Sequence, residues 1–233
     1  MVSKICVIAG VGPGNGASLS RKFSSVGFEV VMLARNGVYL TELGNTIAGS
    51  HGIVCDVRDP DSICKAFARV QKDFGLVDVL VYNAGAGEWS SAEQTSIEGF
   101  ESSWRTNALG LLVASQQVIP GMRKRKRGSI VVIGATASLR GGARTTAFAS
   151  AKAAQRSLAQ SMARGLGPAG VHVSYVVIDG VIDLERTRDH MPDKPNEFFL
   201  QPDAIAEAVY RLTEQDSSAW SFEIDLRPYA EKW

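Results

Sequence analysis

Short apolar segments alternate with longer amphipathic segments along the whole chain. The apolar segments are rich in Val and Ile and span residues 4–9, 29–34, 52–55, 78–83, 129–134, 171–178 and 221–226. Helical patterns lie between them, near 17–26, 38–49, 60–74, 97–122, 149–167 and 202–214. Strands that are nearly continuously apolar indicate a parallel sheet covered by helices on both faces. The sequence therefore predicts an α/β protein with a doubly wound, seven-stranded parallel sheet.

The length of the chain favours one domain. The 233 residues contain no repeat, linker or low-complexity segment, so we expect a single Rossmann fold over 1–233. The least regular stretch is 183–201, which is polar and contains two prolines. In this architecture such an insertion often forms a lid over the site.

Charge gives no reason to expect a nucleic acid or a membrane as partner. The net charge is +1 and the pI is about 7.7. One basic run, "RKRKR", occupies 123–127; we interpret it as a solvated helix end rather than a nuclear-localisation signal. The first apolar run is too short to span a membrane, and no signal-type cleavage site follows it. A cytoplasmic protein is the expectation.

No metal site is expected. The three cysteines form no CxxC pair and fit reduced thiols better than a disulfide framework or a zinc site. The histidines are scattered without metal-ligand spacing, at His51, His172 and His190.

A glycine cluster follows the first predicted strand directly. In "AGVGPGNGAS" the glycines at 10, 14 and 16 lie between the strand and a helix that opens near Ala17. Glycine permits the tight turn there and lets backbone N–H groups approach a pyrophosphate at the positive end of the helix. An ordinary strand-to-helix turn is the alternative, and the position at the first strand–helix junction favours cofactor binding.

The second strand ends in "MLARN", and this predicts the cofactor preference. Sites that choose NAD usually place a carboxylate there, whereas Arg35 offers a guanidinium group that suits a 2′-phosphate. Pro13 stands where a second basic residue would have strengthened the case. We therefore expect a preference for NADP(H), with NAD(H) possible.

Four further motifs, with the glycine loop, resemble the short-chain dehydrogenase/reductase family over essentially the whole chain. They are "CDV" with Asp56, "YNAG" at 82–85, Asn107 in "WRTNALG", and Lys152. The resemblance implies that Asp56 lies near the adenine, that Asn107 holds a water of the proton relay, and that Lys152 binds the nicotinamide ribose. The cofactor-binding set that it implies is Gly10, Gly14, Asn15, Gly16, Arg35, Asn36, Asp56, Val57, Asn83, Ala84, Gly85, Lys152, Gly180 and Ile182.

The catalytic set departs from the family pattern. Where the family has YxxxK, this chain has Phe148 before Lys152, and the family's serine position falls on Ala135. Thr136 and Ser138 lie close by and could supply a hydroxyl instead. Two further departures are Asp179 in place of the proline of a Pro-Gly pair and Leu184 in place of a threonine.

Two functions remain open on these residues. The first is an oxidoreductase that transfers a hydride between NADP(H) and a small carbonyl or alcohol, with Lys152 and Asn107 retained and proton transfer altered at Phe148 and Ala135. The second is a non-catalytic NADP(H)-binding protein with a structural or regulatory role.

The small residues of 97–122 and 149–167 also predict a homodimer or homotetramer. Some aromatic residues could line an apolar pocket or lie in the core: Trp89, Trp104, Phe198 and Phe199.

Overall fold

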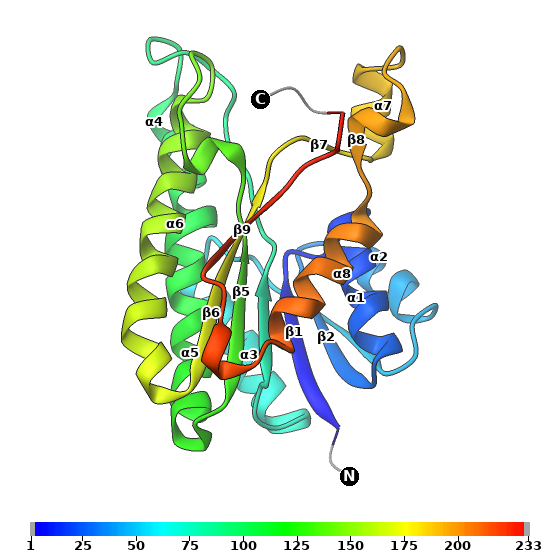
Figure 1. Cartoon of the computed structure of the whole chain (residues 1–233), viewed down its shortest axis with the longest axis vertical. Helices are drawn as coiled ribbons and strands as arrows, with labels where there is room; N and C mark the ends of the chain where they lie inside the picture. Colours follow the sequence, from blue (N-terminus) through cyan, green and yellow to red (C-terminus); the bar gives the residue numbers. More distant parts are fainter. Residues whose placement is uncertain (1–2, 231–233) are drawn as a thin grey trace.

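The computed structural model describes residues 3–230 and has a central sheet of seven parallel strands (Figure 1). The strand order is β3-β2-β1-β4-β5-β6-β9. The strands are β1 (Lys4–Ala9), β2 (Phe28–Ala34), β3 (Ser50–Val54), β4 (Val79–Tyr82), β5 (Gly128–Ile133), β6 (Val171–Ile178) and β9 (Glu223–Leu226). Each predicted apolar segment overlaps one of these strands, so the predicted sheet is confirmed.

Helices cover both faces of the sheet, which makes the fold doubly wound and Rossmann-like (Figure 1). One hydrophobic cluster joins the sheet to α3, α5 and α6, and the other joins it to α1, α2 and α8. All eight residues of β6 are buried, as expected for a strand between two helical layers. The long helices are α1 (Asn15–Ser25), α2 (Gly37–Gly44), α3 (Pro60–Asp73), α4 (Ile97–Trp104), α5 (Gly110–Arg125), α6 (Thr146–Leu166) and α8 (Pro202–Thr213).

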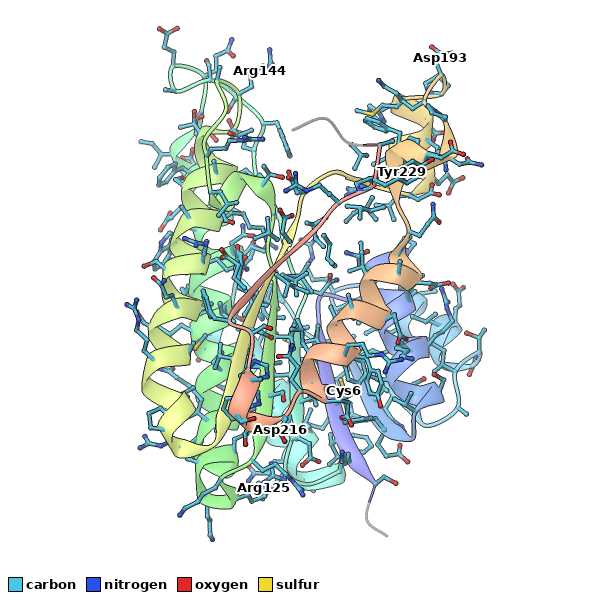
Figure 2. All side chains as sticks on the ribbon, in the orientation of Figure 1. Cys6, Arg125, Arg144, Asp193, Asp216 and Tyr229 are labelled. Atoms are coloured by element: carbon cyan, nitrogen blue, oxygen red, sulfur yellow. The ribbon has the colours of Figure 1, made fainter. Side chains whose placement is uncertain are left out.

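The strand order reverses at β1, which pairs with β2 on one side and with β4 on the other. Ligands of such sheets bind beyond the carboxyl ends of the strands, where loops diverge at this reversal. The loops at that end of the molecule carry Arg144 and Asp193, whereas Arg125 lies at the opposite end (Figure 2). The motifs singled out in the sequence follow β1, β4, β5 and β6 and so belong to the carboxyl end.

The predicted helix 97–122 is interrupted, which the sequence pattern did not indicate. A π-helical turn, Arg105–Leu109, separates α4 from α5. Within it the side-chain amide of Asn107 donates to the Ser103 carbonyl, with Nδ2 to O at 2.8 Å. That carbonyl would otherwise accept the backbone N–H of residue 107, so the side chain competes with the α-helical hydrogen bond. Such π turns frequently occur at functional sites.

The segment 183–201 is more regular than its sequence indicates. It contains a short helix, α7 (Glu185–His190), and it begins and ends at a two-stranded sheet of β7 (Val181–Ile182) and β8 (Phe199–Leu200). The Arg188 guanidinium grips the Asp183 carboxylate with nitrogen–oxygen distances of 2.6 and 2.8 Å. Gln201 donates to the same carboxylate at 2.8 Å. These hydrogen bonds join the start of the segment at Asp183 to α7 and to the end of the segment at Gln201.

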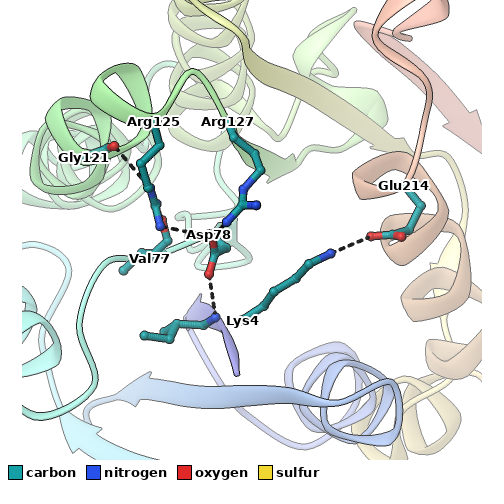
Figure 3. Close-up of polar contacts among 8 residues, drawn as sticks. Lys4, Val77, Asp78, Gly121, Arg125, Arg127 and Glu214 are labelled. Atoms are coloured by element: carbon teal, nitrogen blue, oxygen red, sulfur yellow. Dashed lines mark hydrogen bonds and ion pairs between the residues drawn. The ribbon is translucent and has the colours of Figure 1, made fainter. Parts of the chain in front are cut away.

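At the amino ends of the strands, part of the basic run is tied to one carboxylate (Figure 3). Arg125 ends α5 and donates to Asp78 Oδ1 at 3.1 Å, and Arg127 approaches the same oxygen at 3.3 Å. The other oxygen of Asp78 accepts the backbone N–H of Ile5 at 3.0 Å. The run is therefore a helix end, as predicted; Arg125 is largely buried against Asp78, whereas Arg127 contacts Asp78 and stays mostly exposed.

Candidate active site

The loop after β1 needs its glycines. Gly10 and Gly14 have φ angles of +92° and +101°, which side chains rarely adopt. A Cβ on Gly10 would lie 2.5 Å from the Ala84 backbone, and one on Gly16 would lie 2.7 Å from Val11 Cα. The loop is thus packed against the end of β4 and leads directly into α1, whose first N–H groups face the end of the sheet where ligands bind.

Two asparagines border this loop. Asn83 Nδ2 donates to the Gly10 carbonyl at 2.7 Å and fixes the loop to the segment after β4. Asn15 is only 8% exposed, and its Oδ1 has no hydrogen-bond partner within residues 3–230. A buried acceptor without a partner is uncommon and indicates a place where a ligand or a water donates.

The segment 183–201 reaches the glycine loop through Leu184. A Cβ on Gly14 would lie 2.1 Å from Leu184 Cδ2, so the leucine side chain occupies the space over the glycine. Gly180, at φ +153°, packs against Pro228, where a Cβ would lie 2.8 Å from the proline ring. Ile182 lies in β7, and its carbonyl accepts the Thr187 hydroxyl at 2.6 Å. These residues anchor 183–201 near the loop.

At the ends of β2 and β3, cationic side chains surround one carboxylate. Arg58 donates through Nε and Nη2 to Asp56 at 2.6 to 3.1 Å. This hydrogen bonding, with a smaller contribution from the Arg35 charge, lowers the pKa of Asp56. Arg35 itself is exposed, and Asn36 caps α2 by accepting the Tyr39 N–H at 3.1 Å. Val57, after Asp56, is half-buried.

Lys152 is a buried lysine. Its side chain lies on α6 and is only 4% exposed. Nζ donates to the Ile133 carbonyl at 2.9 Å and to Gln155 Oε1 at 3.0 Å. Burial disfavours the ammonium form and lowers the pKa of Lys152 to about 7. A lysine with this pKa exchanges its proton near neutral pH.

Lys152 and Asn107 meet beside Gly85. A Cβ on Gly85 would lie 3.3 Å from Lys152 Nζ and 3.5 Å from Asn107 Oδ1. Asn107 Nδ2 donates to the Ala86 carbonyl at 2.6 Å in addition to its bond to the preceding turn. Its Oδ1 is buried and lacks a partner among residues 3–230. The π turn therefore presents a free acceptor beside the lysine.

Phe148 begins the same helix face as Lys152. Its ring centroid lies 5.9 Å from Lys152 Nζ, and its backbone side packs on Gly87, where a Cβ would lie 2.6 Å from Phe148 Cβ. The ring stacks on Trp89 with centroids 5.1 Å apart and planes 28° apart. The position four residues before the lysine thus carries an aromatic stack and no exchangeable proton.

The nearby hydroxyl groups are already engaged. Ala135 has only a methyl group, and its carbonyl accepts the Ser138 hydroxyl at 2.7 Å. The Thr136 hydroxyl donates to Asp179 Oδ1 at 2.5 Å. The other Asp179 oxygen pairs with Arg227 at 3.0 Å. Neither hydroxyl is free to donate without breaking one of these bonds.

The structure brings together most of the predicted residues and adds two. Gln155, the acceptor for Lys152, lies three residues further along α6, and this helical spacing could have identified it. Arg227 lies beyond β9 and comes to Asp179 only through the fold, so no local signal points to it. A cavity of about 450 Å³ between α2, β3 and α3 is lined by none of the predicted site residues.

Two kinds of feature do not occur within residues 3–230. No group of three or more His, Cys, Asp or Glu side chains is placed to hold a metal ion. No helix there has the length and apolar composition needed to cross a membrane.

Comparisons with known proteins identify relatives of this chain. A family model for short chain dehydrogenases matches residues 4–194. An uncharacterized oxidoreductase of Staphylococcus saprophyticus is 26% identical over 230 residues, which cover 97% of each chain. A 3-oxoacyl-[acyl-carrier-protein] reductase of Mycobacterium avium is 30% identical over 187 residues, which cover 80% of this chain and 70% of the relative.

Solved structures share the fold over nearly the full length. A short-chain dehydrogenase from Rhodopseudomonas palustris has a TM-score of 0.83 at 32% identity, covering 97% of this chain and 99% of the other. A metagenomic short-chain oxidoreductase in complex with NADP has a TM-score of 0.85 at 26% identity, covering 99% of both chains. With the family model matching most of the sequence, the chain belongs to the short chain dehydrogenase family.

Proposed function

We propose that the protein is a nicotinamide-dependent oxidoreductase that prefers NADP(H), acts on a small carbonyl or alcohol, and has an altered proton-transfer site. The observation that carries the proposal is that Lys152 Nζ and the unpartnered Oδ1 of Asn107 both lie beside Gly85. A buried lysine with a lowered pKa, next to an unpartnered acceptor at the carboxyl end of a doubly wound sheet, is typical of a site for chemistry.

The residues present fit a dinucleotide. The glycine loop brings bare backbone to the start of α1, and the orphaned Oδ1 of Asn15 lies at the same turn. Related proteins of the same family include one solved with NADP. The residues that would hold the cofactor are Gly10, Gly14, Asn15, Gly16, Arg35, Asn36, Asp56, Val57, Asn83, Ala84, Gly85, Lys152, Gly180 and Ile182. When bound, the cofactor supplies the hydride that is exchanged with the substrate.

Arg35 is the basis for the proposed preference. It is exposed at the end of β2, where a guanidinium group can contact a phosphate through two hydrogen bonds. Arg58, by contrast, is held by Asp56 in a bidentate pair. Arg35 is therefore the residue that we assign to the 2′-phosphate.

The proton route is the altered part of the site. Phenylalanine at 148 and alanine at 135 hold no proton, and loss of a positioned general acid costs about 10²- to 10⁴-fold in rate. Lys152 can hold or release a proton at Nζ near neutral pH because its pKa is about 7. A water on Asn107 Oδ1 could exchange with it. We therefore expect slow turnover rather than none.

A second candidate is a non-catalytic NADP(H)-binding protein. The observation that favours it is that the Thr136 and Ser138 hydroxyls are both committed, to Asp179 and to the Ala135 carbonyl. We prefer the oxidoreductase, because a protein that only binds NADP(H) would have no need for the buried, unpartnered acceptor of Asn107 near Lys152.

We further propose a cytoplasmic homo-oligomer, a dimer or tetramer, with 183–201 as a lid over the cofactor. Apolar side chains exposed on α4 and α5 support the assembly: Ile97, Phe100, Trp104 and Leu112. Leu184 against Gly14 supports the lid. The mass from light scattering at micromolar concentration tests the assembly, and a monomer would contradict it.

The function is tested by Lys152→Ala, with Lys72→Ala as a matched control on the exposed part of α3. Calorimetry with NADPH measures binding, and loss of NADPH absorbance with a panel of activated ketones measures turnover. We expect both variants to bind NADPH saturably. Turnover should fall at least about 100-fold in Lys152→Ala and should stay at the parent level in Lys72→Ala. Binding without any turnover in the parent would favour the second candidate.

A further inference from the structure

An aromatic surface lies open beside the candidate site. Trp89, in the loop between β4 and α4, is 62% exposed, and its ring stacks on the half-buried Phe148. Lys152 Nζ is 5.9 Å from the Phe148 centroid, so the stack borders the lysine directly. A large exposed aromatic ring next to a site for chemistry marks a surface for a ligand with a flat apolar face.

The hydroxyl groups of the same region offer no ready proton to a substrate oxygen, and Lys152 has a spare N–H only in its ammonium form. The Thr136 hydroxyl proton points to Asp179, and the Ser138 proton points to the Ala135 carbonyl. Lys152 donates to Ile133 and Gln155, and its pKa of about 7 leaves much of it neutral at physiological pH. A neutral amine has two N–H groups, and both acceptors already use them.

The lack of a proton donor should slow the reduction of saturated ketones more than the reduction of quinones. A saturated ketone that takes up a hydride becomes an alkoxide, whose conjugate acid is about as weak an acid as water. A quinone that takes up a hydride becomes the monoanion of a hydroquinone, and a phenol has a pKa of about 10. The phenolate is stabilised by its ring, so it forms without simultaneous protonation.

We propose that the natural substrates are planar conjugated carbonyl compounds, of the quinone or enone class, bound against Trp89 and Phe148; this rests on the proposed function. In the quinone case the reduced nicotinamide cofactor is the two-electron reductant and becomes oxidised. One hydride adds to the quinone, the ring becomes aromatic, and the negative charge lies on oxygen. A solvent proton then completes the hydroquinone, so atoms and electrons balance. In the enone case the hydride adds to the β-carbon and a solvent proton to the α-carbon of the enolate.

Binding is tested without cofactor or turnover. The probe is 2,3-dimethyl-1,4-naphthoquinone, whose substituted ring cannot be attacked at those carbons by the exposed thiol of Cys64. Calorimetry compares the parent with Trp89→Leu and with Trp220→Leu, a matched control because Trp220 stacks on His172 near the start of β6, at the amino ends of the strands. We expect Trp89→Leu to weaken binding about tenfold and the control to bind like the parent, since an aromatic contact contributes roughly 0.5–1.5 kcal/mol beyond area burial. Equal binding by Trp89→Leu would overturn the proposal.

Selectivity is tested with NADPH by comparing this quinone with 1-tetralone, an aryl ketone of similar size whose reduction gives an alkoxide rather than a hydroquinone anion. The parent should reduce the quinone much faster. Phe148→Tyr adds a proton donor, which helps the alkoxide-forming ketone most, so the quinone-to-tetralone rate ratio should fall at least about tenfold. An unchanged or larger ratio would overturn the proposal while leaving the proposed function intact. Absence of NADPH binding would instead contradict the proposed function.

Discussion

The side-chain amide of Gln155 holds the amino group of Lys152, with Oε1 accepting from Nζ at 3.0 Å inside the protein. Gln155 is fully buried, and its Nε2 has no partner among residues 3–230. The amide is thus buried with only its oxygen satisfied, by Lys152 Nζ and the Tyr175 hydroxyl. We interpret Gln155 as a residue that positions Lys152.

This relationship predicts opposite shifts for two variants. Gln155→Leu removes an acceptor that favours the charged lysine, so the pKa of Lys152 should fall below about 7. Gln155→Glu places a carboxylate there and should raise that pKa by about 1–3 units. The pH profile of turnover, or carbon NMR of the lysine, measures the shift. If Gln155 had a purely structural role, its variants would change the stability of the protein and would not shift the pH profile of turnover.

Burial of Lys152 also predicts a pH dependence of stability. The pKa of Lys152 is about 7 in the folded protein, against about 10.4 for an unfolded lysine. Between these values the unfolded chain binds more protons, so the free energy of unfolding should rise with pH from about 7 to about 10. Below pH 7 the cost of the buried charge is fully present. Urea denaturation at several pH values should show this rise for the parent and not for Lys152→Met. Parallel plots of unfolding free energy against pH for the two proteins would contradict the lowered pKa of Lys152.

Arg35 predicts the choice of cofactor. We expect the parent to bind NADPH more tightly than NADH, and Arg35→Asp to erase or reverse the preference. A charge-assisted contact contributes about 1.5–3 kcal/mol, so the effect should be roughly ten- to a hundredfold. Arg69→Asp makes the same charge change at an exposed position on α3 and should leave the preference intact. Equal dissociation constants for the two cofactors in the parent would show that Arg35 has no such role.

Asp78 predicts a loss of stability far from the site. Its carboxylate is 12% exposed and binds the Ile5 N–H together with Arg125 and Arg127 (Figure 3). Asp78→Asn keeps the size but loses the charge, and we expect the free energy of unfolding to fall by about 1.5–3 kcal/mol. Asp73→Asn, which weakens the exposed ion pair with Arg69, should cost much less. Urea denaturation measures both, and equal losses would refute the structural role of Asp78.

The sheet was predictable from sequence because the inner strands, such as β1, β4 and β6, are apolar on both faces, and a helix-covered parallel sheet buries such strands. The glycine loop was predictable for a similar reason, since positive φ angles at Gly10 and Gly14 leave few other residues. The π turn at Asn107 was not, because one side-chain hydrogen bond to Ser103 decides it and leaves no trace in the periodicity. The order within 183–201 depends on Asp183 meeting Arg188 and Gln201, which are contacts that apolar patterning does not encode.

At the candidate site, residue types were predictable and their partners were not. The sequence identifies Thr136 and Ser138 as possible proton donors, but only the structure places their hydroxyls on Asp179 and the Ala135 carbonyl. The pKa of Lys152 likewise follows from burial, which depends on how α6 packs on the sheet.

We propose that the chain transfers hydride although Phe148 stands four residues before Lys152. A direct measurement uses NADPH with deuterium in both positions at C4 and 2,2,2-trifluoroacetophenone, an activated ketone whose alcohol product retains a carbon-bound label. Mass spectrometry should find one deuterium per product molecule, formed slowly by the parent and at least about tenfold faster by Phe148→Tyr with Ala135→Ser, because these changes supply the missing proton donors. Saturable binding of NADPH with no labelled alcohol from the parent would contradict the claim.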